Sequence, residues 1–252
     1  MQSDTYTGRV ALIIGGAGTL GALLAARLTM LGVRVMLADV QEQPLHALAQ
    51  DLRAGGADVA ARLCDVTWED DVRALVADTL EVWGRLDLAV NCAGTTTRIR
   101  RVVDLEEAEF DRVFAVSVKG VLFGMKYQIP AMSSSGEGVI VNVASLAGLS
   151  GFPNLGADAA AHHAIVGLTR TAAIEAAPDN VRINAICPSC MASSVTGEKA
   201  VARLGDRVAS GAPMRRLGRP EEVVEAILML CAPGNSYITG QAIAVDGGIS
   251  AS

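Results

Sequence analysis

The chain has 252 residues, of which 51% are hydrophobic and 19% are charged, with a formal net charge of −6. This apolar content excludes an intrinsically disordered chain, and the acidic balance argues against a nucleic-acid binder, which needs a basic face. The length favours a single domain.

Seven short apolar segments alternate with helical patterns, and we expect these segments to be strands. They are Arg9–Ile14, Val33–Ala38, Asp58–Leu63, Leu86–Val90, Gly138–Val143, Val181–Cys187 and Ala242–Val245. Most are continuously apolar, as strands covered on both faces are. Strands and helices that alternate in this way predict a parallel sheet.

The helical patterns lie between these strands. They are Leu20–Leu31, Pro44–Ala54, Glu69–Trp83, a long stretch from Glu106 to Met132, Ala157–Ala176 and Pro220–Leu230. Residues 133–136, Ser-Ser-Ser-Gly, predict a loop, and no linker divides the chain. We therefore expect an α/β fold in which residues 1–252 form one doubly wound domain, with a seven-stranded parallel sheet flanked by helices.

Three uncharged runs raise the question of a membrane span: 11–26, 139–157 and 226–245. Glycine, proline or asparagine interrupts each of them, whereas a spanning helix must be continuously apolar. The N-terminus also lacks the basic start of a signal peptide. We expect a cytoplasmic protein that has neither a membrane nor a nucleic acid as partner.

A glycine-rich segment at 15–21, Gly-Gly-Ala-Gly-Thr-Leu-Gly, follows the first strand and opens a helix. Its glycines allow a pyrophosphate to approach the backbone, and the helix N-terminus offers N–H donors. Asp39 ends the second strand, where its carboxylate either accepts both ribose hydroxyls of an adenosine or caps the next turn. In the first case it would repel the extra phosphate of NADP. The pattern predicts a Rossmann domain that binds NAD and not NADP.

Further motifs occur in a characteristic order. They are Asp65-Val66, Asn91-Cys92-Ala93-Gly94, the segment 140–145 that ends at Ser145, the segment 182–188 that ends at Pro188, Gly218–Glu222, Ile238–Gln241 and Val245–Gly248. In these motifs the chain resembles the short-chain dehydrogenase/reductase family over essentially its full length. The resemblance implies a set of cofactor-binding residues: Gly15, Thr19, Leu20, Gly21, Asp39, Asp65, Val66, Asn91, Ala93, Gly94, Pro188 and Ser193.

The family performs its reaction with an Asn, Ser, Tyr and Lys tetrad, of which this chain retains only the serine, Ser145. Counting without gaps from Ser145, the tyrosine position is Asp158 and the lysine position is His162, while Ser117 stands for the asparagine. No realignment restores the pair, because no tyrosine of the chain is followed four residues later by a lysine. The resemblance thus implies a loss of the family's proton relay.

Three cofactor positions have also changed. Thr19 replaces the middle glycine of the phosphate loop, Ser189 replaces the glycine of a Pro-Gly turn, and Ser193 replaces a threonine that often meets the nicotinamide amide. A threonine Cβ and methyl at position 19 would lie where the backbone should nearly touch phosphate. We therefore expect NAD binding to be weakened or absent, unless the loop shifts to accommodate the cofactor.

Three functional readings follow from this pattern. The first is a non-catalytic, structural or regulatory subunit that pairs with a related active subunit through its long helices. The complex would be a hetero-oligomer, expected to be a tetramer, that oxidises a small alcohol or hydroxyacyl substrate with NAD, as two-subunit hydroxyacyl-CoA dehydrogenases do. The second is an enzyme in which Asp158 and His162 perform altered acid–base chemistry. The third is a module that binds NAD or another ligand.

The substituted residues allow other arrangements. Asp158 and His162 are four residues apart on a helix and could form an ion pair. Ser145, His162 and Asp158 also have the residue types of a hydrolase triad, which requires Ser–His and His–Asp hydrogen bonds in series. His163 lies on a different helix face from His162, so no metal site is expected. Cys187 and Cys190 form a lone CxxC pair, which by itself is weak evidence for zinc or redox chemistry.

Overall fold

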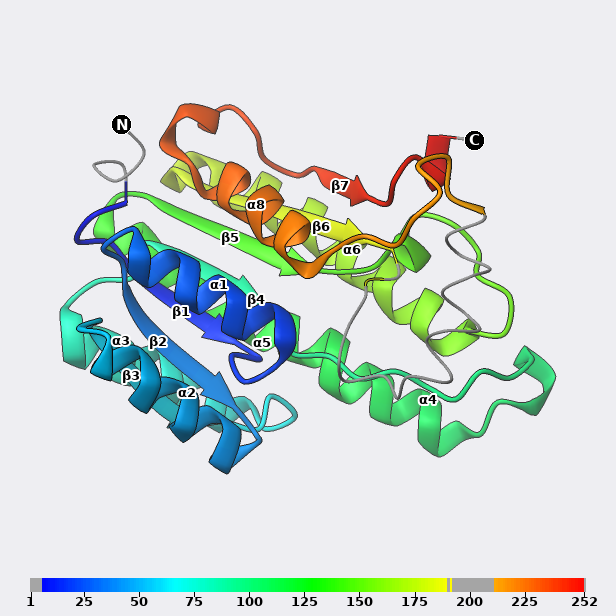
Figure 1. The fold of residues 1–252 in the computed structure, drawn as a ribbon, viewed down its shortest axis with the longest axis horizontal. Helices are drawn as coiled ribbons and strands as arrows, with labels where there is room; N and C mark the ends of the chain where they lie inside the picture. Colours follow the sequence, from blue (N-terminus) through cyan, green and yellow to red (C-terminus); the bar gives the residue numbers. More distant parts are fainter. Residues whose placement is uncertain (1–5, 190, 192–210, 252) are drawn as a thin grey trace.

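Seven parallel strands form one sheet with the order β3-β2-β1-β4-β5-β6-β7 (Figure 1). The structure is a computed structural model that describes residues 6–189, 191 and 211–251. The strands are β1 (Val10–Ile14), β2 (Arg34–Asp39), β3 (Val59–Leu63), β4 (Leu88–Asn91), β5 (Gly138–Val143), β6 (Val181–Pro188) and β7 (Ala242–Val245). The predicted doubly wound α/β fold with seven parallel strands is confirmed.

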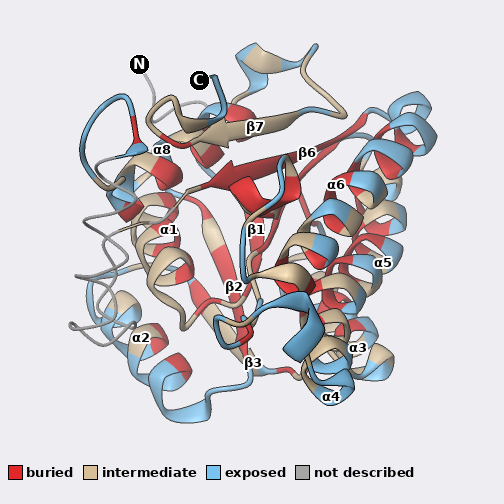
Figure 2. Ribbon diagram, turned by 90° about the vertical axis from the view of Figure 1, so that its right-hand side faces the viewer, coloured by how far each residue is buried: buried red, intermediate tan, exposed pale blue. Residues whose placement is uncertain are grey.

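Helices cover both faces of the sheet (Figure 2). They are α1 (Thr19–Met30), α2 (Glu42–Ala54), α3 (Glu69–Trp83), α4 (Glu107–Val113), α5 (Lys119–Ser135), α6 (Gly156–Ala176) and α8 (Pro220–Cys231). Successive side chains of a strand point to opposite faces. Accordingly Ile13 packs in a core with residues of α1, α2 and α8, whereas its neighbour Leu12 packs in a second core with residues of α3, α5 and α6. This double burial explains why the strands are continuously apolar.

The predicted element boundaries agree with the structure to within two residues, except between residues 106 and 136. There the single predicted helical stretch is divided into α4, a π-helical turn at Phe114–Val118, and α5. The loop predicted at 133–136 is wrong, because α5 continues to Ser135. The hydroxyls of Ser133 and Ser134 donate to carbonyls one turn earlier, and Gly136, with φ 86°, ends the helix.

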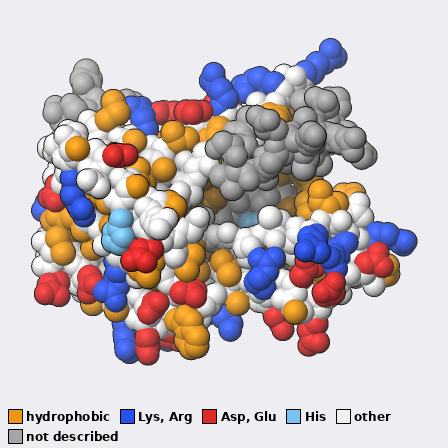
Figure 3. Space-filling model, turned by 60° about the horizontal axis from the view of Figure 1, so that its bottom comes forward, with side chains coloured by type: hydrophobic (Ala, Val, Ile, Leu, Met, Phe, Trp, Pro, Cys, Tyr) orange, Lys and Arg blue, Asp and Glu red, His pale blue; other side chains and the backbone are white. Residues whose placement is uncertain are grey.

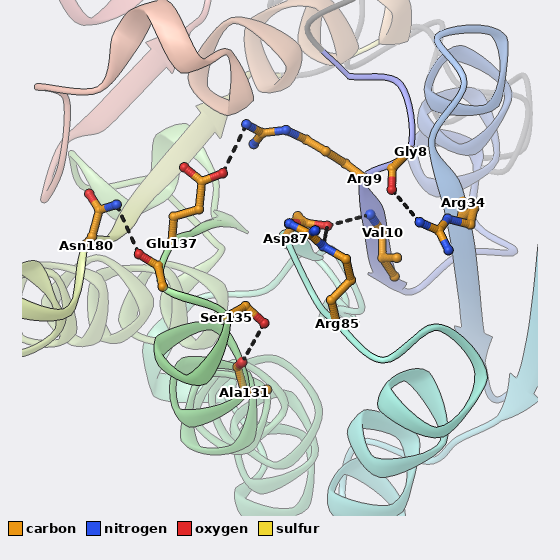
Figure 4. Close-up of polar contacts among 11 residues, drawn as sticks. Gly8, Arg9, Val10, Arg34, Arg85, Asp87, Ala131, Ser135, Glu137 and Asn180 are labelled. Carbon is orange, nitrogen blue, oxygen red and sulfur yellow. Dashed lines mark hydrogen bonds and ion pairs between the residues drawn. The ribbon is translucent and has the colours of Figure 1, made fainter.

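At the end of the sheet where the strands begin, polar contacts connect separate chain segments (Figure 4). Buried Asp87 accepts hydrogen bonds from the backbone N–H of Val10 (2.8 Å) and from Arg85 Nε (2.9 Å). Arg9 forms an ion pair with Glu137 at 3.3 Å. These contacts join the starts of β1, β4 and β5. Ligands of doubly wound folds bind at the opposite end, where the strands finish, which we call the carboxyl edge of the sheet.

Two surface properties bear on the expected partners. Within the described part of the chain, no helix is long and apolar enough to cross a membrane. On the face shown in Figure 3, acidic and basic side chains are interspersed around a central hollow.

Candidate functional site

The first cavity at the carboxyl edge, which we call the nucleotide cavity, lies where β1, β2 and β4 end. Six of the predicted cofactor-binding residues line it: Gly15, Asp39, Asp65, Val66, Ala93 and Gly94. Thr19, Leu20 and Gly21 lie next to it, in the first turn of α1. The N–H groups of such a first turn have no partner within the helix and are free for an anion.

The glycine loop is shaped by close backbone approaches. Gly15 adopts φ +87°, and a Cβ there would lie 2.6 Å from the backbone nitrogen of Ala93. A Cβ on Gly21 would collide with the carbonyl oxygen of Gly15. Gly21 therefore permits helix packing and Gly15 permits the tight turn, as a dinucleotide-binding loop requires. The residues present fit a bound dinucleotide, with Thr19 as the departure from the pattern.

Asp39 holds this loop in place. Its Oδ2 accepts a hydrogen bond from the N–H of Ala17 and its Oδ1 accepts one from the N–H of Gln41, each at 3.0 Å. The capping role anticipated for Asp39 is thus observed. Because a carboxylate oxygen can accept two hydrogen bonds, each oxygen keeps one acceptor position for a ribose hydroxyl.

Asn91 supports the site without lining it. Its side-chain amide is buried and exchanges hydrogen bonds with Gln128, at 2.8 and 3.1 Å, and donates to Asn142 at 2.8 Å. Asn142 continues the network to Thr169. The side-chain amide thus joins β4 to α5 and β5, and its polar atoms are engaged inside the protein; the contact of Asn91 with a cofactor stays a prediction.

The second cavity, which we call the cleft, continues from the nucleotide cavity and shares Cys92, Ala93 and Gly94 with it. An extended ligand can therefore occupy both. The fold brings all four tetrad positions to this cleft: Ser117, Ser145, Asp158 and His162.

Asp158 lies in the first turn of α6 and its side chain is buried. Its Oδ2 accepts hydrogen bonds from the N–H of Thr97 (3.3 Å) and from the Thr97 hydroxyl (2.5 Å). Its other oxygen, Oδ1, accepts no hydrogen bond from a described residue. The carboxylate thus fastens the loop after β4 to α6 and keeps one oxygen for a ligand. Sequence reasoning missed Thr97, although a run of three threonines after Gly94 offered a signal.

Other contacts fasten the same loop. The Arg112 guanidinium donates to the Thr95 hydroxyl at 2.5 Å and to the Thr96 carbonyl at 3.0 Å. The backbone N–H of Arg100 donates to the Asn154 carbonyl at 2.9 Å. The wall of the cleft is therefore held from both α4 and α6.

His162 follows Asp158 by one turn of α6, and its Nδ1 is enclosed with no hydrogen-bond partner among the described residues. Burial lowers the pKa of the ring, an effect larger than that of the Asp158 carboxylate, which raises it. Burial thus favours the neutral form of the His162 ring. The anticipated ion pair between His162 and Asp158, both of which are described, is not formed, and the carboxylate accepts hydrogen bonds from Thr97.

Ser145 and Ser117 differ in their burial and in the hydrogen bonds of their hydroxyls. Ser145 follows β5, and its Oγ accepts a hydrogen bond from the N–H of Ala147 at 3.2 Å, which leaves its hydroxyl proton for a ligand. Ser117 is buried in the π-helical turn, and its Oγ accepts from the N–H of Thr95 at 3.4 Å. No hydrogen bond joins His162 to Ser145 or to Asp158, all of which are described, so the hydrolase triad is absent.

The remaining predicted positions lie at the end of β6. Pro188 ends that strand and Ser189 lines the cleft. Ser193 and Cys190 lie outside the described residues. The part of the chain that the structure describes holds no cluster of three metal-ligating side chains.

Comparison with known proteins places this geometry among nucleotide-dependent oxidoreductases. The family model described as enoyl-(acyl carrier protein) reductase matches residues 15–250. Cyclohexanol dehydrogenase of Acinetobacter sp. (strain SE19) is 32% identical over 247 residues, which cover 98% of this chain and 97% of that enzyme.

Two similar solved structures contain a dinucleotide. Xylitol dehydrogenase with bound NAD+ has a TM-score of 0.92 and 31% identity, and the match covers 96% of this chain and 99% of that one. ElxO with bound NADP has a TM-score of 0.89 and 28% identity, covering 97% and 99% respectively. Proteins of this fold therefore include examples of both cofactors.

Proposed function

The chain belongs to the short-chain dehydrogenase/reductase family, and we propose that it serves as the non-catalytic subunit of a hetero-oligomeric, NAD-dependent alcohol or hydroxyacyl dehydrogenase. The observation that carries this proposal is the state of the cleft. Asp158 is engaged by Thr97, and His162 is a neutral, partly buried ring. At these two positions the family's reaction needs a proton donor of suitable pKa and a cation beside it.

The chain's own residues can still bind and orient a ligand. Among the described residues, none accepts a hydrogen bond from the Ser145 hydroxyl and none donates to Asp158 Oδ1, so both groups are proposed to contact a ligand. NAD, when bound, supplies the hydride acceptor for alcohol oxidation. With Ser145 as the one remaining tetrad side chain, we expect the cleft to hold ligands without moving a proton at a useful rate.

The proposed cofactor is NAD and not NADP. Asp39 and Asp65 line the nucleotide cavity, and no lysine or arginine is among its described lining residues. A 2′-phosphate on the adenosine ribose would thus face carboxylates without a compensating cation. The side chain of Thr19, at the start of α1, is proposed to weaken the binding of NAD.

The proposed partner is a related subunit that retains Tyr and Lys at these positions. The surface proposed for the pairing is that of the two long helices α5 and α6, each of which carries one exposed aliphatic side chain, Leu122 and Ile174 respectively.

Purification tests the proposal. The chain, isolated from its native cells under its own promoter, is expected to co-purify with a second short-chain dehydrogenase/reductase that contains Tyr-x-x-x-Lys, and the complex is expected to oxidise an alcohol with NAD. Isolation of a homo-oligomer without such a partner would contradict the proposal.

A second candidate is an enzyme with altered acid–base chemistry, which the presence of Asp158 and His162 on one cleft favours. Eliminations and isomerisations need no hydride transfer. In that case Asp158→Asn would abolish the turnover of the native preparation, whereas a non-catalytic subunit would leave turnover largely intact.

A further inference from the structure

The charge of the cleft differs from that expected of the family. Among the described residues that line it, Asp158 is the one carboxylate, and neither a lysine nor an arginine is present. Burial lowers the pKa of His162 and so favours its uncharged form. A ligand group in the cleft therefore faces one carboxylate and, among the described lining residues, no lysine or arginine.

This carboxylate is placed to act on a ligand. Both of its described hydrogen bonds are to Oδ2, which leaves Oδ1 without a partner among the described residues. Asp158 is 5% exposed. At that burial, solvent and salt screen its charge far less than they screen a surface carboxylate.

The two adjoining cavities would place the nicotinamide half of a dinucleotide in the cleft that Asp158 lines. The glycine loop and Asp39 lie at the nucleotide cavity, and the cleft continues from it along Cys92, Ala93 and Gly94. A dinucleotide whose adenosine half occupied the first cavity would extend its nicotinamide half into the second. The nicotinamide ring carries a positive charge in NAD+ and none in NADH.

We infer that Asp158 makes the chain selective for the oxidised dinucleotide, so that it binds NAD+ more tightly than NADH. The inference rests on the proposed binding of NAD by this chain, and it adds the redox form that the site selects. A subunit with this selectivity is occupied according to the ratio of NAD+ to NADH.

Calorimetric titration with NAD+ and with NADH tests the inference on three variants. Asp158→Asn removes the charge, while its amide oxygen can still accept both hydrogen bonds from Thr97. Thr97→Val keeps the charge and loses the hydroxyl contact. Asp104→Asn is the matched control, since it removes an exposed carboxylate that does not line the cleft.

The natural chain is expected to bind NAD+ more tightly than NADH. Asp158→Asn is expected to reduce the affinity ratio about fivefold, through weaker binding of NAD+, as the loss of one poorly screened charge predicts. Thr97→Val and Asp104→Asn are expected to keep the ratio within about twofold.

Two results would overturn the inference in different ways. If both forms bind and Asp158→Asn leaves their ratio unchanged, the selectivity assigned to Asp158 is wrong while the nucleotide site stands. If neither form binds to the natural chain, the proposed nucleotide site fails and the selectivity fails with it.

Discussion

At the scale of single residues, Asp158, which the sequence predicts to stand at the tyrosine position, makes a structural contact with Thr97. Asp158 and Thr97 are 61 positions apart in the chain, and their hydrogen bonds connect α6 to the loop after β4. Both side chains are buried. A buried carboxylate that loses a donor pays a desolvation penalty, so this contact contributes to stability as well as to the shape of the cleft.

We expect Thr97→Val to lower the free energy of unfolding by about 1–2 kcal/mol, because it leaves a buried carboxylate with one donor fewer. Asp158→Asn should cost less, since the amide oxygen still accepts from Thr97. Urea denaturation at pH 7 measures both values. A Thr97→Val variant as stable as the natural chain would show that the contact adds nothing to stability.

His162 predicts a specific dependence of stability on pH. Burial holds the pKa of the folded ring below its ordinary value of 6.5. As the pH falls through 6.5, the unfolded chain therefore takes up a proton that the folded chain does not, and the folded state loses stability.

We expect the natural chain to lose more stability than His162→Gln between pH 7.5 and pH 5.5. His163→Gln, which changes an exposed histidine one position away, is the control and should behave like the natural chain. Urea denaturation at both pH values gives the comparison. Equal losses in His162→Gln and the natural chain would refute the assignment.

At the scale of elements, the glycine loop and α1 combine a retained geometry with one changed residue. Gly15 and Gly21 are required by the close approach of backbone atoms, whereas Gly18 has an ordinary φ of −70° and more room. The loop is therefore shaped by two of its glycines, and Thr19 affects the ligand more than the fold.

Alanine substitutions separate these roles. We expect Gly21→Ala to destabilise the chain by about 3 kcal/mol, because its Cβ would collide with backbone atoms of Gly15 and Gly16. Gly18→Ala is expected to cost less than about 1 kcal/mol. Thermal unfolding followed by circular dichroism distinguishes the two, and similar midpoints would contradict the packing argument.

Thr19→Gly tests the expected weakening of the cofactor site. Removal of the threonine side chain allows the backbone to approach a phosphate more closely, so NAD should bind about fivefold to tenfold more tightly. Calorimetry measures the change. An unchanged dissociation constant would mean that the loop already accommodates the side chain.

At the scale of the whole molecule, the outer helices and the cleft are proposed to have different roles, assembly for the helices and ligand binding for the cleft. The fold and its two cores are those of the short-chain dehydrogenase/reductase family, whereas the proposal for the cleft is that it lacks the residue pair that moves the proton. The division of labour proposed above follows from this contrast, because a subunit can keep its surfaces for assembly after its own chemistry has been lost.

Restoring the pair tests whether the loss is confined to two positions. We expect Asp158→Tyr/His162→Lys to give the isolated chain detectable NAD-dependent alcohol oxidation, because Ser145 already lines the cleft. Absorbance at 340 nm in the presence of small secondary alcohols measures it. A folded double variant that binds NAD and remains inactive would show that further positions, such as Ser117, have drifted beyond simple repair.

Sequence patterns alone determined the order of strands and helices, the parallel sheet and the glycine loop. These features depend on local periodicity and on residues close together in the chain, so they can be read without coordinates. The predicted boundaries are wrong only at residues 106–136, where the helix continues through a serine run to Ser135 and a π-helical turn divides the stretch.

Only the tertiary structure decided what the substituted residues do. Sequence spacing suggested an Asp158–His162 pair, but packing placed Thr97, from a distant loop, within hydrogen-bond distance of the carboxylate. Burial lowers the pKa of His162, and a buried amide network engages the side chain of Asn91. Partners, burial and pKa depend on groups that meet through folding, and one-dimensional spacing does not specify them.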